Sequence, residues 1–143
     1  MTQHRVAVVQ AGTSLFDTPR TLERMAVHCE TAAREGVELA VFAEGYVGGY
    51  PKGLTFGATL GHRSAEGRDI FSRYMDAAIR CPGPETEQLA ALATELSLHV
   101  VIGVIERAAH TLYCASLVFA PGRGLILKHR KLMPTGSERL LWG

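Results

Sequence analysis

The stretch ELAVFAEGYVGGYPKG, residues 38–53, indicates the fold class, because it runs from a buried strand into a glycine-rich loop. Residues 38–42 end in the apolar run Leu-Ala-Val-Phe, which is typical of a strand covered on both faces. Glu44 follows this run, and α/β proteins usually place their sites beyond the carboxyl ends of strands. We therefore interpret Glu44 as a candidate site residue; the alternative is an exposed loop acid or an N-cap partner.

The residues before this stretch predict a strand followed by a helix. Residues 6–9 form a valine-rich run that predicts a second strand buried on both faces. Asp17 is a capping residue placed before Pro19, and apolar residues then recur at helical spacing. Gly36 stands where such a helix ends. Strand, helix and strand follow one another in this part of the chain.

The residues after this stretch predict an irregular region and two helices. Glycines continue through Gly57 and Gly61 to Gly67, and an irregular region of this length in a compact domain indicates that it lines a site. A short helix is predicted at residues 70–79. The Cys-Pro-Gly-Pro-Glu break at residues 81–85 starts another helix.

Three strands are predicted in the last third of the chain. They cover residues 100–105, 112–119 and 125–129, and the last two are separated by a turn at 121–124. Both alternating sets of side chains in 112–119 are apolar or small, so both faces of this strand need cover. Parallel and hairpin-connected strands are thus mixed, and an α/β layered architecture satisfies the pattern.

Composition excludes several classes of protein. The 143 residues are 47% hydrophobic and 20% charged, which indicates one globular domain. A net charge of +1 gives no general attraction for nucleic acid or for an anionic membrane. No signal peptide is evident, and no apolar stretch approaches the roughly 18 residues that span a bilayer. We therefore predict a cytoplasmic protein with no membrane partner.

Sequence motifs for cofactors are also missing. The six histidines form no metal-binding spacing with a carboxylate, so we predict no metal. Neither glycine-rich phosphate motif occurs, and we predict no nucleotide or other cofactor. The three cysteines show no CxxC spacing, which suits a reducing compartment.

Lys131 is a second candidate, because it follows the last predicted strand. A lysine there can act as a fixed positive charge that stabilises a developing anion. The run from Lys128 to Lys131 is Lys-His-Arg-Lys, which is also compatible with a nucleic-acid patch. Alternation along a strand opposes that interpretation, since Lys128 and Arg130 should face away from His129 and Lys131.

Glu138 is a third candidate. It is close enough in sequence to Lys131 to share a site with it if residues 134–136 turn back. The alternative is a surface acid paired with Arg139.

Four segments carry a resemblance to a known family. They are VFAEGYVGGYPKG (41–53), CPGPE (81–85), GVIER (103–107) and YCASLVFAPGRGLILKHRKLMPTGSERLLWG (113–143). Together they resemble the amino-terminal half of the nitrilase superfamily of carbon–nitrogen hydrolases, and within it the nitrilase and cyanide-hydrolase branch. The resemblance implies an αββα sandwich that is incomplete here, with residues 1–143 as the amino-terminal part of a single domain.

The resemblance also implies roles for the three candidates. Family members use a Glu, Lys, Cys triad with a second glutamate nearby. Matched motif to motif, Glu44 takes the place of the general base, Lys131 that of the charge-stabilising lysine and proton donor, and Glu138 that of the second acid. The implied reaction is hydrolysis of a nitrile to a carboxylic acid and ammonia through a cysteine thioimidate and thioester.

The family places the nucleophilic cysteine in a Cys-Trp-Glu segment that lies further along the polypeptide than Gly143. We therefore expect the isolated chain to be inactive, and we expect self-association, as a dimer or spiral, or pairing with a cysteine-containing half. Three alternatives stay open: a non-catalytic truncated partner, one chain of a two-piece enzyme, and a small α/β nucleic-acid-binding domain that uses Lys128 to Lys131.

The cysteines that are present do not suit the nucleophile's role. Cys29 lies on a helix stripe and Cys114 within a strand, and both positions are typical of buried structural cysteines. Cys81 precedes a proline in a loop and is expected to be the most accessible of the three. No base is adjacent to it in sequence.

Two departures from the family pattern bear on the structure: the residue before Glu44, and the carboxyl-terminal half of the family's domain, which these 143 residues lack. Ala43 stands where the family usually has proline before the glutamate, so the backbone that aims Glu44 is expected to be less rigid. Phe42, Leu117, Phe119 and the apolar run at 140–142 are expected to lack packing partners, which predicts exposed apolar surface and open sheet edges.

Overall fold

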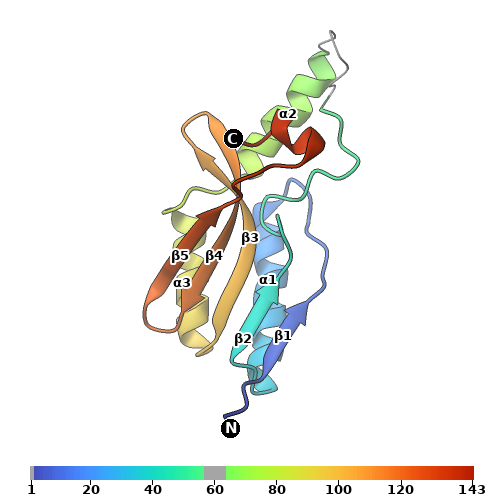
Figure 1. The fold of residues 1–143 in the computed structure, drawn as a ribbon. Coiled ribbons are helices and arrows are strands. Elements are labelled where there is room, and N and C mark those ends of the chain that lie inside the picture. Colours follow the sequence, from blue (N-terminus) through green and yellow to red (C-terminus); the bar gives the residue numbers. More distant parts are fainter. Residues whose placement is uncertain (1, 57–63) are drawn as a thin grey trace.

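The computed structural model describes residues 2–56 and 64–143 and contains a five-stranded sheet with helices on one face (Figure 1). Its elements in chain order are β1 (Val6–Val9), α1 (Thr18–Arg34), β2 (Leu39–Phe42), α2 (Ala65–Ala77), α3 (Pro84–Glu95), β3 (His99–Ala108), β4 (Thr111–Ala120), β5 (Gly124–Arg130) and the 3₁₀ helix η1 (Gly136–Leu140). Strands β1, β2 and β3 are parallel, and β3, β4 and β5 are antiparallel neighbours. The predicted α/β architecture with mixed strand connections is confirmed.

Helix α1 has the cap, the terminating glycine and the apolar stripe that its sequence predicts. The side chain of Asp17 accepts a hydrogen bond from the backbone N–H of Arg20, which caps the first turn. Gly36 follows the helix with φ of +72°, a conformation that favours glycine. The apolar stripe faces the sheet, and its buried members include Leu22, Met25 and Cys29. None of the helices that the structure describes has the length and apolarity needed to cross a bilayer.

Helix α2 begins earlier than the sequence predicts. Ser64 caps it by accepting from the backbone N–H of Gly67, so Gly67 lies in the first helical turn and not in an irregular region. The helix ends at Ala77, two residues before the predicted end. Gly57 and Gly61 lie outside the described residues. The serine cap outweighs the low helix propensity of glycine, which the prediction weighted too heavily.

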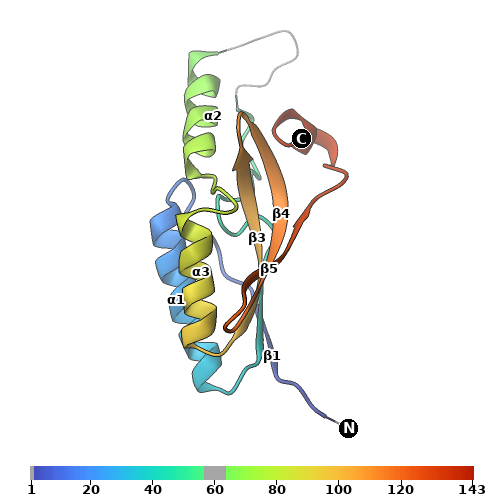
Figure 2. The ribbon, with the colours of Figure 1, turned by 90° about the vertical axis from the view of Figure 1, so that its left-hand side faces the viewer.

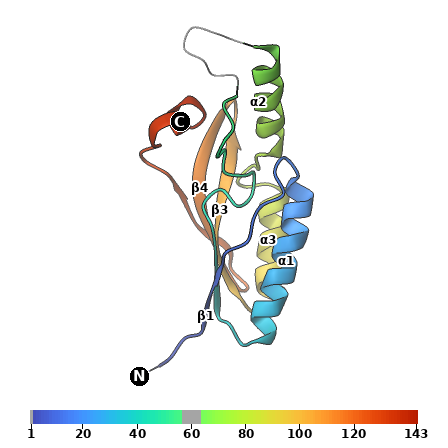
Figure 3. The same ribbon diagram turned by 90° about the vertical axis from the view of Figure 1, so that its right-hand side faces the viewer.

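Helices α1 and α3 cover one face of the sheet, as Figures 2 and 3 show from opposite sides. The core on this face contains Phe42, Leu117 and Phe119, all buried, together with Met25 of α1 and Leu89 of α3. The expectation that these three residues lack packing partners is therefore wrong. The helices of this chain already cover them, because α1 and α3 bring their apolar stripes to the same side.

The opposite face of the sheet carries an uncovered apolar row. One residue from each strand is in register in this row: Val8, Val41, Val101, Val118 and Leu127. Val8 is 75% exposed and Leu127 is 51% exposed, so the prediction that residues 6–9 are buried on both faces is wrong. Strand β1 is an edge strand, and no helix among the described residues packs on this side of it. Exposed apolar surface is therefore present, as the sequence predicts. It is formed by this row and not by Phe42, Leu117 and Phe119.

A buried carboxylate joins β3 to β5 on the helix-covered face. Glu106 is 2% exposed, and it accepts from Lys128 Nζ at 2.6 Å and from Arg130 Nε at 2.7 Å. The guanidinium of Arg130 also lies over the ring of Tyr113 on the intervening strand, 3.8 Å from its centroid. Burial alone would raise the pKa of Glu106, but the hydrogen bonds from Arg130 and Lys128 outweigh it and the pKa is lowered.

Replacing Glu106 with glutamine leaves two cations without their counter-charge. We expect the free energy of unfolding to fall by about 2 kcal/mol, below the usual cost of breaking a buried pair, because Lys128 and Arg130 are 31% and 38% exposed. Since the pKa of Glu106 is lowered by folding, its contribution is complete above the ordinary glutamate pKa and is lost as the pH falls through the folded value. The difference between the two proteins should therefore shrink in acid.

Urea unfolding at neutral pH and at about pH 3 measures both effects. Glu38→Gln is the matched control, because Glu38 pairs with His4 on the exposed surface and its loss should change stability much less than the loss of Glu106. Equal losses for the two variants at neutral pH would refute the role of Glu106.

Candidate active site

Glu44 is placed by a turn that packs directly on β3. A side-chain carbon at Gly103 would lie 2.6 Å from the Cα of Glu44, so only glycine permits this approach. Val47 N donates to Gly103 O at 3.1 Å, and Ile105 N donates to Val47 O at 2.8 Å. These two bonds tie the turn to β3. The expectation that Ala43 makes this backbone less rigid stays a prediction.

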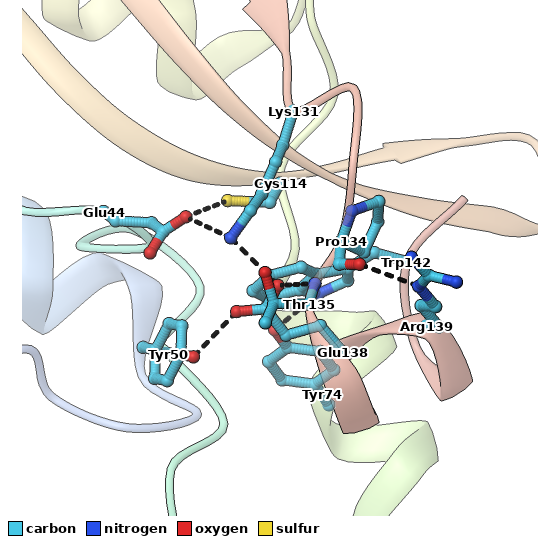
Figure 4. A network of polar contacts seen from close by, with 10 residues as sticks. All are labelled: Glu44, Tyr50, Tyr74, Cys114, Lys131, Pro134, Thr135, Glu138, Arg139 and Trp142. Atoms are coloured by element: carbon cyan, nitrogen blue, oxygen red, sulfur yellow. Dashed lines mark hydrogen bonds and ion pairs between the residues drawn. The ribbon is translucent and has the colours of Figure 1, made fainter.

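Lys131 continues the strand pairing of β5 by one residue. Its backbone N–H donates to the carbonyl of Cys114 on β4 at 2.7 Å. Its side chain points away from the face on which Lys128 and Arg130 meet Glu106, as alternation predicts. Lys131 Nζ lies 2.9 Å from Glu44 Oε1 and 2.9 Å from Glu138 Oε2 (Figure 4).

Glu138 reaches the same place from η1. The chain turns back after Lys131, and the backbone N–H of Thr135 donates to Glu138 Oε2 at 2.6 Å. Its other oxygen accepts from the hydroxyl of Tyr50 at 2.7 Å. The alternative pairing with Arg139 is not formed, because Arg139 Nε donates instead to the carbonyl of Pro134. All three site residues predicted from the sequence therefore lie together.

The ion pair between Lys131 and Glu138 stabilises the charged form of both side chains. Hydrogen bonds to Glu138 and Glu44 raise the pKa of Lys131. The backbone N–H of Thr135, with the hydrogen bonds from Lys131 and Tyr50, lowers the pKa of Glu138 to about 2 against the opposing effect of burial. Lys131 is therefore held protonated and Glu138 ionised at neutral pH.

The two carboxylates differ in what they can still do. Both oxygens of Glu138 are occupied by donors, and its side chain is only 7% exposed. The side chain of Glu44 is 49% exposed, and its Oε1 accepts from Lys131. Among the residues that the structure describes, none donates to Glu44 Oε2. Glu44 can therefore take a proton from an incoming group, whereas Glu138 is suited to a fixed charge.

Cys114 lies in the site, and sequence reasoning missed it. Its Sγ is 3.5 Å from Glu44 Oε1, although the residue is only 5% exposed. Burial and then the charge of Glu44 raise the pKa of this thiol to about 12. Burial also raises the pKa of Cys29 to about 12 and that of Cys81 to about 11. A nucleophilic thiol needs a low pKa, so none of the three is suited to that role.

Trp142 corrects another expectation. We expected the run at 140–142 to lack packing partners, but Trp142 is 4% exposed and its Nε1 donates to the hydroxyl of Tyr74 at 3.1 Å. Lys131 Nζ lies 5.6 Å from the centroid of its ring. Only Leu140 of this run is largely exposed, at 70%. The segment after Lys131 thus packs into the site region.

Two other features relevant to a site are the grouping of metal-ligating side chains and the cations of the Lys128 to Lys131 run. In the described part of the chain, no three His, Cys, Asp or Glu side chains are grouped so that they could hold a metal ion. Lys128 and Arg130 are paired with Glu106, and Lys131 is paired with Glu44 and Glu138. These three cations are therefore compensated by carboxylates and form no continuous basic surface.

Comparisons with known proteins show which family the chain resembles. The family model described as carbon–nitrogen hydrolase matches residues 5–143. The chain is 52% identical to an aliphatic nitrilase of Sinorhizobium fredii over 100% of its own length and 46% of the relative's. It is 48% identical to a bifunctional nitrilase/nitrile hydratase of Lupinus angustifolius over 97% of its own length and 40% of the relative's. The chain thus spans less than half the length of these two relatives.

Solved structures show the same fold at low sequence identity. An amidase from Nesterenkonia sp. superposes with a TM-score of 0.70 at 15% identity, over 98% of this chain and 47% of the amidase. A carbon–nitrogen hydrolase superfamily protein of Xanthomonas campestris gives a TM-score of 0.72 at 19% identity, over 100% of this chain and 46% of that protein. At this level of identity the likeness shows the fold alone.

Proposed function

The chain belongs to the carbon–nitrogen hydrolase family, and we propose that it supplies the base, the lysine and the second acid for hydrolysis of a nitrile. The observation that carries the proposal is the position of Lys131 Nζ, 2.9 Å from an oxygen of Glu44 and 2.9 Å from an oxygen of Glu138. The names of the curated relatives, which are nitrilases, support the nitrile as the substrate class.

The proposal requires a cysteine nucleophile other than Cys29, Cys81 and Cys114. The raised pKa values and the burial of these thiols are the reason. We use the term assembled enzyme for the protein in which residues 1–143 act together with that cysteine, in one polypeptide or in two. By this proposal the 143 residues alone hydrolyse no nitrile.

In the first step, Glu44 Oε2 accepts the proton of the nucleophilic thiol. The sulfur attacks the nitrile carbon, so a carbon–sulfur bond forms while one carbon–nitrogen π bond breaks. The nitrogen takes up the proton that Glu44 accepted, passed on through the ammonium group of Lys131, which gives a thioimidate and leaves Glu44 ionised for the next step. Lys131 has three N–H donors, two of which are directed to Glu44 and Glu138; the third is available to the nitrogen on which charge develops.

In the second step, Glu44 removes a proton from a water molecule that attacks the thioimidate carbon. The carbon–nitrogen bond of the resulting tetrahedral adduct breaks, and the nitrogen leaves as ammonia with the proton that came from the thiol and the two protons of this water, so that a thioester remains. A second water then hydrolyses the thioester and restores the thiol. Overall, one nitrile and two waters give one carboxylic acid and one ammonia.

Glu138 has a different part in this proposal. Its oxygens accept from Tyr50, Thr135 and Lys131, and because these donors favour its ionised form, it is poorly suited to take up a further proton. Its charge keeps Lys131 protonated and aimed toward the reacting nitrogen. The two glutamates thus divide the work of base and fixed anion.

The test is the product balance of the assembled enzyme with a set of aliphatic and aromatic nitriles. We expect ammonia and the corresponding carboxylic acid in equal amounts, with the matching amide measured in parallel. Release of the amide without ammonia would mean that the tetrahedral adduct, formed when water adds to the thioimidate, breaks by loss of the cysteine thiolate and not by loss of ammonia. Hydrolysis of amides with no turnover of any nitrile would reject the nitrile as the substrate class.

A further inference from the structure

Tyr50 reaches across the site from the glycine-rich loop to the turn after Lys131. Its hydroxyl donates to Glu138 Oε1 at 2.7 Å, a contact between residues 88 positions apart in the sequence. Its ring meets that of Trp142 edge to face, with the centroids 5.9 Å apart. Tyr50 therefore joins the loop after Glu44 to the segment that carries Glu138 (Figure 4).

The backbone next to Tyr50 is fixed by a buried chain of hydrogen bonds. Trp142 Nε1 donates to the hydroxyl of Tyr74 at 3.1 Å, and this hydroxyl donates to the carbonyl of Gly49 at 3.1 Å. Tyr74 is fully buried and Trp142 nearly so. Breaking either bond would leave a polar group unpaired away from water, so this arrangement is held firmly. Gly49, and with it Tyr50, is thus anchored to α2.

The two oxygens of Glu138 are held from different elements. Oε2 accepts from Thr135 N–H and from Lys131, whereas Oε1 accepts from Tyr50. The last torsion of a glutamate has only weak intrinsic preferences, so the direction of its carboxylate is set by its hydrogen-bond donors. The hydrogen bond from Tyr50 adds a donor on the second oxygen, from a different element, and so restricts this torsion further. It therefore also fixes the direction in which Glu138 draws the flexible side chain of Lys131.

We infer that Tyr50 is a positioning residue, which holds Glu138 and through it the ammonium group of Lys131 in the orientation that nitrile hydrolysis requires. The inference rests on the proposed function. Tyr50 acts through Glu138 and not on the reacting atoms, because its hydroxyl proton is already donated to the carboxylate. That hydrogen bond also raises the pKa of Tyr50, so the hydroxyl stays a donor at neutral pH.

The first test measures the pKa of Glu138 by following the carbon NMR signal of its side-chain carboxyl during a pH titration of the assembled enzyme. The hydrogen bonds from Thr135, Lys131 and Tyr50 hold the pKa of Glu138 well below the ordinary value of a glutamate. Tyr50→Phe removes only the hydroxyl, and we expect the pKa of Glu138 to rise because a donor to its charged form is lost. Tyr113→Phe is the matched control, since Tyr113 packs against Arg130 on the other face of the sheet and should leave this pKa unchanged.

The second test is a double-mutant cycle in the assembled enzyme. We expect Tyr50→Phe to lower kcat about tenfold, the loss that one hydrogen bond to a charged group typically produces, with little change in KM. In a Glu138→Gln background the same substitution should have almost no further effect, because Tyr50 acts only through Glu138. A structural or substrate-binding role would give the same loss in both backgrounds.

These outcomes separate the inference from the proposed function. If the pKa of Glu138 is the same in Tyr50→Phe as in the native chain, or if the losses in the cycle add, the inference about Tyr50 is overturned while nitrile hydrolysis can still stand. If the assembled enzyme hydrolyses no nitrile, the proposed function is overturned, and the pKa of Glu138 still decides whether Tyr50 positions it.

Discussion

Glu44→Gln is expected to lower kcat/KM for nitrile hydrolysis roughly a thousandfold in the assembled enzyme, within the range that a general base contributes. The amide has the size of the carboxylate and can still accept from Lys131, so the site should keep its shape. It cannot take up the thiol proton or activate water. Because the proposal gives Glu44 both tasks, ammonia release should fall by this factor with every nitrile.

The control for this variant is Glu23→Gln. Glu23 is an exposed acid of α1, on the helix-covered side of the sheet, so its loss should leave activity unchanged. Thermal unfolding of both variants shows whether the fold is kept. A Glu44→Gln enzyme that is folded and retains most of its activity would mean that another group is the base.

Lys131→Ala is expected to lower kcat for nitrile hydrolysis by about a hundredfold to a thousandfold, the range found when one donor to a developing charge is removed. The substitution also leaves Glu44 and Glu138 facing the same space without the cation that lies between them. Their mutual repulsion should disturb the position of Glu44 as well. Steady-state ammonia release from a saturating nitrile measures the effect.

Lys52→Ala is the matched control for Lys131, because Lys52 is an exposed lysine of the glycine-rich loop. Its removal changes the net charge equally and should leave kcat unaffected. If Lys131→Ala hydrolyses nitriles as fast as Lys52→Ala, the assignment of Lys131 to the reaction is wrong.

Much of the fold could be predicted from local patterns. The period of the side chains and the turn residues predict the helical stripe of α1, its cap at Asp17 and the sequence of helices and strands along the chain. The same alternation correctly separates Lys128 and Arg130 from Lys131. These features depend on neighbours in the sequence, which is why sequence reasoning reaches them.

Long-range pairings could not be predicted in this way. The exposure of Val8 depends on which face of the sheet the helices cover, and periodicity does not give that information. The contact of Cys114 with Glu44 depends on the pairing of β2 with β3 and of β3 with β4. The hydrogen bond from Tyr50 to Glu138 joins two loops whose approach is set by the whole domain.

The candidate site could be predicted only in part from the sequence. Glu44 was indicated by its position after a strand, and Lys131 and Glu138 were assigned mainly through the resemblance of their segments to a family. Their meeting at 2.9 Å distances around Lys131 Nζ is a finding of the structure. The catalytic roles of the three residues stay predictions until the variants described above are measured.

By the proposed function, these three residues serve a cysteine nucleophile that is none of Cys29, Cys81 and Cys114. Peptide mass spectrometry of the assembled enzyme, quenched in acid during turnover of a nitrile, identifies that cysteine. We predict an adduct with the mass of the thioimidate or acyl group on a cysteine outside residues 1–143, and no adduct in Glu44→Gln. An adduct on Cys114, or on either of the other two cysteines of this chain, would contradict the proposal.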